Sequence, residues 1–128
     1  MNSKYFKDSE LQCHGTACGN CQKLPTQQLV DKLNQIREAY GKPIGLTNAF
    51  RCPIHNAAVG GAKASKHMFG FAADVADGKG DFAKWIASRL DHFDVWIEEP
   101  TQTIGWCHVQ CVPYPGWTKG MSRIFRAR

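Results

Sequence analysis

The sequence predicts one α+β domain in which a small, largely antiparallel sheet is covered by helices on one face. Two observations lead to this fold class. Apolar residues recur at helical spacing in two segments, and short runs of aromatic and branched residues, typical of strands, lie around them. The length of 128 residues is enough for one modest hydrophobic core but not for two. We therefore expect residues 1–128 to form a single domain, with a cysteine-containing N-terminal segment at 1–23 and a basic C-terminal tail at 113–128.

Two helices are expected to cover the sheet. The first follows Pro25 and Thr26 and ends at Gly41, a common helix stop. Its apolar residues recur at the spacing of one helical face: Leu29, Leu33, Ile36 and Tyr40. The second helix runs over 81–90, after a turn at 77–80, and its apolar face holds Phe82, Trp85, Ile86 and Leu90.

Four short runs are predicted as strands, at 44–50, 71–75, 93–98 and 106–112. The segment 51–63 is predicted as a loop or short helix with a hinge at Gly60 and Gly61. A polar turn at 100–103 joins the last two strands, and 113–117, with two prolines and a glycine, is predicted to be irregular. Successive side chains of a strand point to opposite faces. In the last strand the core face should therefore hold Cys107, Val109 and Cys111, and the other face Trp106, His108 and Gln110.

Two polar residues that are costly to bury lie on either side of an apolar step. Residues 65–74 read Ser-Lys-His-Met-Phe-Gly-Phe-Ala-Ala-Asp and contain His67 and Asp74. An unpaired carboxylate inside an apolar strand is expensive, and a bound metal would relieve that cost. A catalytic zinc ion takes three protein ligands and leaves a fourth position for water. Because His108 in the last strand supplies the third, we predict a zinc site of His67, Asp74 and His108, in a cleft on the sheet face opposite the helices.

The same residues carry a resemblance to a known family. The pattern SxHxxGxAxD at 65–74, followed by WxH at 106–108, resembles the peptidoglycan-cleaving zinc peptidases, which include VanY-type D-Ala-D-Ala carboxypeptidases and phage L-Ala-D-Glu endopeptidases. Upstream, Arg51, Asn56 and the Gly60-Gly61 pair follow in the order and spacing of the compact phage-type branch. The resemblance covers roughly residues 5–112. It implies a hedgehog/DD-peptidase-like fold, one catalytic zinc, and a phage-associated enzyme that hydrolyses a peptide bond in bacterial peptidoglycan.

The resemblance also implies roles for residues around the zinc ligands. Arg51 matches an arginine that faces the cleft, where it could hold a substrate carboxylate or polarise the scissile carbonyl. Ser65 matches a serine that hydrogen-bonds near the site and contacts substrate. Many members carry an acid three residues before the last histidine, but this chain has Gly105 there. The general base is therefore expected to be Glu98 or Glu99. Strand alternation favours Glu98 and the match to the compact branch favours Glu99, and of the two Glu99 is slightly preferred as the expected base.

Six cysteines need an explanation: Cys13, Cys18, Cys21, Cys52, Cys107 and Cys111. The first three, with His14 beside them, could bind a second, structural metal, with Cys52 or Cys111 as a further ligand. Disulfides and buried thiols are the alternatives. Disulfides are less expected because the N-terminus has no apolar signal region, so the chain should be made in a reducing compartment. A cysteine nucleophile is not expected, because Cys107 and His108 are adjacent on a strand and point to opposite faces.

The net charge and the hydropathy of the chain limit the classes of partner that we expect it to bind. Sixteen Lys and Arg against eleven Asp and Glu give a formal charge of +5, which favours polyanions in general or simply a solvated surface. Basic and aromatic residues are not interleaved, so we expect no nucleic-acid partner, although a zinc-knuckle nucleic-acid-binding protein is one alternative function. A non-catalytic cell-wall-binding or structural module is another, which Gly105 would allow.

The absence of a long apolar run argues against a membrane span. We expect a monomer that is synthesised in the cytoplasm and acts on the peptidoglycan stem peptide, at the cell wall, in the periplasm or as part of a phage particle.

Overall fold

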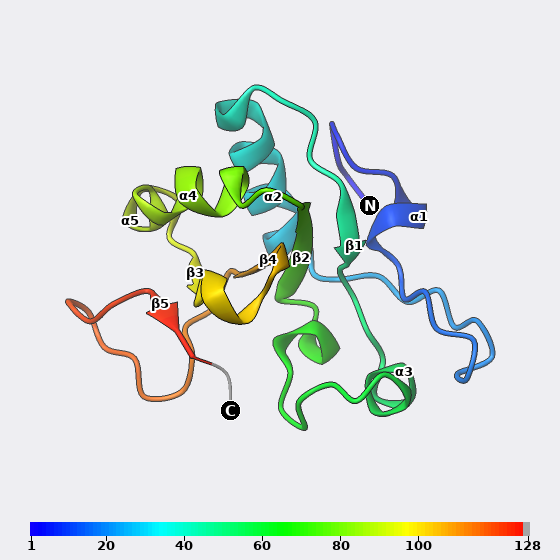
Figure 1. The fold of residues 1–128 in the computed structure, drawn as a ribbon. Helices are drawn as coiled ribbons and strands as arrows, with labels where there is room; N and C mark the ends of the chain where they lie inside the picture. The colour runs from blue at the N-terminus through cyan, green and yellow to red at the C-terminus, as the bar shows by residue number, and fades with distance from the viewer. Residues whose placement is uncertain (127–128) are drawn as a thin grey trace.

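The computed structural model describes residues 1–126. Its elements, drawn in Figure 1, confirm the predicted α+β class. Two short 3-10 turns, η1 (Lys66–Phe69) and η2 (Pro100–Gln102), accompany the helices α1 (Asp8–Leu11), α2 (Gln27–Tyr40), α3 (Pro53–Ala58), α4 (Asp81–Ala87) and α5 (Leu90–Phe93). The strands are β1 (Leu46–Asn48), β2 (Ala72–Asp77), β3 (Trp96–Glu98), β4 (Gly105–Gln110) and β5 (Ile124–Phe125).

The five strands form one sheet in the order β1-β2-β4-β3-β5. Neighbouring strands are antiparallel except β3 and β5, which are parallel, so the predicted largely antiparallel sheet is confirmed. In the central pair, β2 and β4, Asp74 lies directly opposite His108. Directly opposite residues place their side chains on the same face. The register of two strands therefore brings together groups that are 34 residues apart in the sequence.

The opposite face of the sheet packs on the core. Ala73 and Val75 of β2 and Cys107 and Val109 of β4 are buried there among apolar side chains of α2, α4 and α5.

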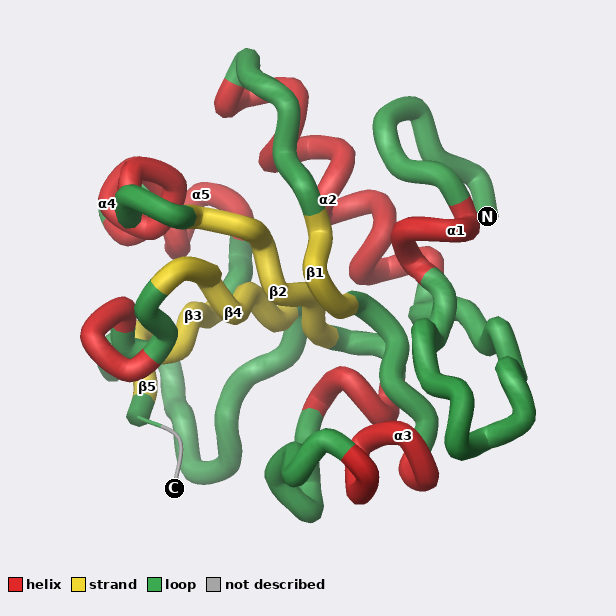
Figure 2. The backbone as a smooth tube through the Cα atoms, turned by 45° about the vertical axis from the view of Figure 1, so that its right-hand side comes forward, coloured by secondary structure: helices red, strands yellow, loops and turns green. Residues whose placement is uncertain are grey.

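The predicted first helix is confirmed as α2. The Thr26 hydroxyl accepts a hydrogen bond from the Leu29 N–H at its start, and Gly41 ends it with a left-handed φ of 75°. Figures 1 and 2 place α4 and α5 at one end of the sheet and α3 at the other.

The segment 81–98 differs from the prediction of one helix followed directly by a strand. The helix breaks after Ala87, and residues 90–93 form the separate short helix α5. Phe93 belongs to that helix, and Asp94 ends it in the left-handed region with φ 54°. The predicted strand over 93–98 therefore begins only at Trp96. The first strand is also shorter than predicted, since its pairing with β2 has a register shift between Leu46 and Asn48.

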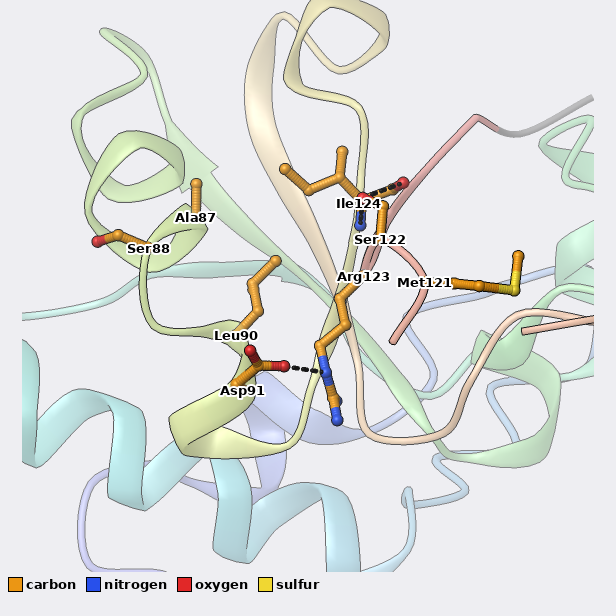
Figure 3. Close-up of a pocket in the computed structure, with 8 residues that line it drawn as sticks. All are labelled: Ala87, Ser88, Leu90, Asp91, Met121, Ser122, Arg123 and Ile124. Atoms are coloured by element: carbon orange, nitrogen blue, oxygen red, sulfur yellow. Dashed lines mark hydrogen bonds and ion pairs between the residues drawn. The ribbon is translucent and has the colours of Figure 1, made fainter. Parts of the chain in front are cut away.

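The C-terminal segment, named a basic tail in the prediction because of its charge, packs against the domain. Its strand β5 pairs with β3, and the Arg123 guanidinium bonds the carboxylates of Asp91 and Asp94 at 2.8 and 2.9 Å. The same guanidinium lies over the rings of Trp96 and Trp117, at 4.4 and 4.9 Å from their centroids. Figure 3 shows Arg123 reaching Asp91 beside a shallow hollow. Arg128, also counted in the predicted tail, lies outside the described residues.

Residues 1–126 contain no helix with the length and apolar character needed to cross a membrane.

Candidate metal centre

The structure brings the three predicted metal ligands together. His67 Nε2 lies 3.2 Å from Asp74 Oδ1, and His108 Nδ1 lies 3.1 Å from the same oxygen. The two imidazole rings meet edge to face, with their centroids 5.0 Å apart. His67 and Asp74 are buried, and His108 is nearly so. Each residue thus offers one donor atom to a common centre.

Local sequence explains how each group is held. Asp74 lies in the middle of β2 between Ala72 and Ala76, whose small side chains leave room on the cleft face. His67 lies in the 3-10 turn η1, where the Ser65 hydroxyl accepts a hydrogen bond from the His67 N–H. Gly70 ends that turn with a φ of 77°, a conformation that favours glycine. The glycine of the SxHxxGxAxD pattern is therefore the residue that turns the chain from the histidine into the strand of the aspartate.

The outer nitrogen of each imidazole is fixed by an acceptor. His67 Nδ1 donates to the Ala49 carbonyl oxygen at 2.8 Å, because a carbonyl can only accept. His108 Nε2 lies 2.9 Å from Gln110 Oε1, and the Gln110 amide nitrogen donates to the Val112 carbonyl, which orients the amide oxygen toward the histidine. In the neutral histidines both protons therefore point outward. The inner nitrogens present lone pairs to the centre, as metal-binding imidazoles require.

These residues fit a divalent metal ion. Each imidazole lone pair lies within 3.2 Å of the same carboxylate oxygen, and acceptors at that distance are stable only with protons or a cation between them. Burial raises the pKa of Asp74, but the His108 and His67 side chains beside its carboxyl group outweigh that effect and hold the pKa well below its usual range. The carboxylate is therefore ionised. Two His and one Asp are a ligand set of catalytic zinc.

The two candidate bases lie in different surroundings. Glu98 is half-buried at the end of β3, where burial raises its pKa and the nearby charges of His108, Asp74 and His67 act on its carboxyl group. The register that pairs Trp96 with Gln110 and Ile97 with Val109 puts Glu98 next to His108 on the cleft face. The Glu99 carboxylate instead accepts hydrogen bonds from the N–H and hydroxyl of Thr101 in η2. The structure therefore brings Glu98, and not Glu99, toward the metal ligands.

Gly105 occupies the position where many members of the resembling family carry an acid. It opens β4 with a φ of 93°, a conformation that residues with a side chain rarely adopt. A glutamate at this position would be strained. The glycine therefore has a conformational reason, and the half-buried carboxylate of Glu98 comes from the neighbouring strand.

Arg51 and Ser65 lie beside the metal ligands. The Arg51 guanidinium donates to the Ser65 hydroxyl at 3.4 Å, and the Arg51 backbone N–H donates to the His67 carbonyl at 3.2 Å. Burial lowers the pKa of Arg51, and the negative charge of Asp74 opposes that change. The Arg51 Nε atom is buried without a hydrogen-bond partner in the described structure. The Arg51 guanidinium is therefore a half-buried cation beside the candidate metal ligands.

A cysteine nucleophile has no support in the geometry. Cys107 is 1% exposed on the core face, and burial raises the pKa of its thiol to about 12. His108 points to the other face, as strand alternation predicts.

Trp96 is also buried, under Arg123 and Trp117, whereas Trp106 is 37% exposed beside the cleft.

A hollow of about 210 Å³ lies away from these residues, between α5 and the segment before β5 (Figure 3). Its charged members, Asp91 and Arg123, already bond each other, and it contains none of the metal-binding candidates. This hollow lies at the junction where the C-terminal segment packs on the rest of the domain.

Two partners of the metal ligands were missed by sequence reasoning. The sequence predicts Gln110 on the cleft face, and its position two residues after His108 on a strand is the signal that the two side chains are neighbours. The Ala49 carbonyl is a backbone group, and no residue type marks it in the sequence.

Two imidazoles and a carboxylate that converge on one point of a small α+β domain could hold a metal ion, with the ligand types found in zinc hydrolases. A family model described as Peptidase M15 matches residues 4–103, which include His67 and Asp74 and end before His108. The match covers most of the chain. The chain therefore belongs to the Peptidase M15 family, and the resemblance predicted from its motifs is confirmed at that level.

One curated relative is the zinc D-Ala-D-Ala carboxypeptidase of Streptomyces albus G. It is 40% identical to this chain over 62 residues, which are 48% of this chain and 24% of that protein. The chain thus spans about a quarter of the length of the relative that it matches.

Proposed function

We propose that this protein is a zinc peptidase that hydrolyses a peptide bond in bacterial peptidoglycan. The observation that carries the proposal is the convergence of His67, Asp74 and His108, with both outer imidazole nitrogens fixed so that the inner lone pairs face one carboxylate oxygen. Membership of the Peptidase M15 family and the similarity to a zinc D-Ala-D-Ala carboxypeptidase support the metal and the substrate class.

His67, Asp74 and His108 would hold the ion. When bound, zinc supplies a Lewis acid that polarises the scissile carbonyl and makes a water molecule acidic enough to attack near neutral pH. Glu98 accepts the proton of the attacking water and passes it to the leaving amine. Its placement suits this role, since its carboxyl group is half-buried beside His108 and no side chain of the described residues holds it by a hydrogen bond that would lower its basicity.

Arg51 binds the anionic part of the substrate. Its bond to Ser65 positions the guanidinium near Asp74, where it could hold a stem-peptide carboxylate or the oxygen that becomes negative during attack. A terminal carboxylate is present in a carboxypeptidase substrate, and a carbonyl oxygen in either substrate type. Both carboxypeptidase and endopeptidase action are consistent with this placement, and the phage-associated lysis role remains a prediction from motif spacing.

The test is digestion of purified muropeptides with product identification by mass spectrometry, together with zinc analysis of the same protein. We expect wild type to release a defined stem-peptide fragment and His67→Ala to lose both bound zinc at this site and cleavage. His92→Ala is the matched control, because His92 is exposed on α5 and belongs to no metal-binding group among the described residues. Zinc binding by wild type without cleavage of any muropeptide would contradict the proposal and support a binding module instead.

A further inference from the structure

We propose that Cys13, Cys18, Cys21 and Cys52 bind a second zinc ion, with Cys52 as the fourth ligand. The four Sγ atoms all lie within 4.8 Å of one another, and those of Cys13 and Cys18 are 4.0 Å apart. Cys111, the other cysteine considered as a further ligand, is buried in the hydrophobic core. The ring of His14 bonds the Ser9 carbonyl oxygen instead.

The mutual spacing of the thiols fits a tetrahedral ion better than disulfides. Zinc–sulfur bonds of about 2.3 Å put the four sulfur atoms of a tetrahedral site about 3.8 Å apart. A disulfide needs only two sulfur atoms together, at about 2.05 Å, and places no demand on the other pair. Here all four thiols are close to each of the others, and a contraction of at most about one ångström brings them to zinc-binding distances.

The loop that carries three of the thiols has little else to hold it. Among residues 12–24 only Cys13 and Gly15 are buried, and neither a helix nor a strand is present. The turn through Cys18-Gly19-Asn20-Cys21 places Asn20 in the left-handed region at φ 56°, and Gln22 follows at φ 53°. Such conformations cost free energy in residues with a side chain and persist where the surroundings enforce them. An ion bound by both cysteines of this CxxC turn would enforce them.

The fourth ligand connects this loop to the metal centre of the cleft. Cys52 caps α3, where its Sγ accepts a hydrogen bond from the His55 N–H at 3.4 Å. The preceding residue is Arg51, whose N–H bonds the His67 carbonyl. Gly15 packs so closely on the His55 side chain that an added Cβ would lie 2.6 Å from it. Figure 2 shows the N-terminal loop beside α3. The second zinc would therefore fix Cys52 and, through the chain, the position of Arg51.

The experiment compares metal content in the full chain after dialysis against metal-free buffer. We expect about two zinc ions per chain in wild type and about one in Cys52→Ser and in His67→Ala. Cys18→Ser should also hold about one, and because Cys18 is only partly buried in the loop, this variant separates ligand loss from misfolding. Cys111→Ala is the matched control and should keep both ions. The two sites lose zinc in different variants, so failure of one proposal is distinguishable from failure of the other.

A second readout identifies thiolate ligands directly. Replacement of zinc by Co²⁺ should give a thiolate-to-cobalt charge-transfer band in wild type and His67→Ala, and the band should be lost in Cys18→Ser and Cys52→Ser. The His67, Asp74 and His108 site contains no thiolate and cannot give that band. Zinc content unchanged in both cysteine variants would overturn the proposal. So would fewer than six titratable thiols in the unreduced, denatured chain, since disulfides would then occupy the cluster.

Discussion

Glu98 and Glu99 are neighbours in the sequence, but their side chains lie in different surroundings. Glu98 is the last residue of β3, and its side chain follows Trp96 onto the cleft face of the sheet. Glu99 lies one residue later, where the chain leaves the strand, and its carboxylate caps η2 by accepting from Thr101. A general base must be within reach of the water it deprotonates and must not be held elsewhere. The contacts of the two side chains therefore favour Glu98.

We expect Glu98→Gln to lower kcat for muropeptide cleavage by about 10²–10⁴-fold while zinc stays bound. Glutamine keeps the size of the side chain and removes its ability to take a proton. Glu99→Gln is the matched control and should retain most activity, because an amide oxygen can still accept from Thr101. Single-turnover kinetics and zinc analysis of both variants decide the matter. A large loss in Glu99→Gln with an active Glu98→Gln would reverse the assignment.

At the residue scale, the sequence predicted side chains with strong chemical reasons to converge. His67, Asp74 and His108 were identified because a carboxylate in an apolar strand and two histidines need a common partner. The base was harder, since pattern matching and strand alternation pointed to different glutamates. Only the observed register of β3 on β4 and the bond of Glu99 to Thr101 separate the two. The identity of Cys52 as the fourth member of the cysteine cluster likewise depends on where α3 packs.

The elements beside the cleft are held by contacts from the end of the chain. Arg123 joins α5 to β5: it bonds Asp91 and Asp94, and its guanidinium lies over the rings of Trp96 and Trp117. The carboxylates are mostly exposed, so the ion pairs contribute little. The stacking on two rings is largely shielded, because the Arg123 side chain is only 14% exposed. Phe125 follows in β5 and contacts the His108 ring edge to face, at 5.9 Å between centroids.

Arg123→Ala should lower the free energy of unfolding by about 1–2 kcal/mol, mainly through the lost cation–π contacts. Thermal or urea unfolding measures this value, and tryptophan fluorescence should shift as Trp117 becomes exposed. Lys119→Ala, at an exposed position in the same segment, is the control and should change the stability by less than about 0.5 kcal/mol. Equal stability of the two variants would show that the segment does not depend on Arg123.

At the element scale, a prediction succeeded where the sequence shows both a regular spacing of apolar residues and residues that mark the ends of the element. The helix α2 combines four apolar residues at helical spacing with Thr26 and Gly41 as its ends. The segment 81–98 has the helical spacing, but no glycine marks where its helix ends. The left-handed residue that ends α5 is Asp94. The two-residue strand β5 is too short for a pattern, and it forms because β3 offers an unpaired edge beside it.

At the scale of the whole molecule, core and metal ligands lie on different faces of one sheet. The helices α2, α4 and α5 bury an apolar layer that needs no metal. The cleft face and the N-terminal loop instead gather polar groups into two clusters, each of which could hold a metal ion. Metal binding should therefore stabilise the cleft and the loop without being needed for the helices to form.

Removal of the metal by a chelator should affect the cleft and the N-terminal loop but not the helical core. After treatment with a strong chelator we expect loss of muropeptide cleavage and a lower unfolding temperature, with far-UV circular dichroism showing that α2 and the other core helices persist. A ligand at 100 times its Kd stabilises the folded state by about 2.7 kcal/mol per site, so restored zinc should recover stability in proportion to the sites filled. His67→Ala should recover only the part due to the cysteine cluster, and Cys18→Ser only the part due to the cleft. An unfolding temperature that does not respond to chelator or to added zinc, in protein shown to have lost its metal, would mean that neither cluster contributes to folding stability.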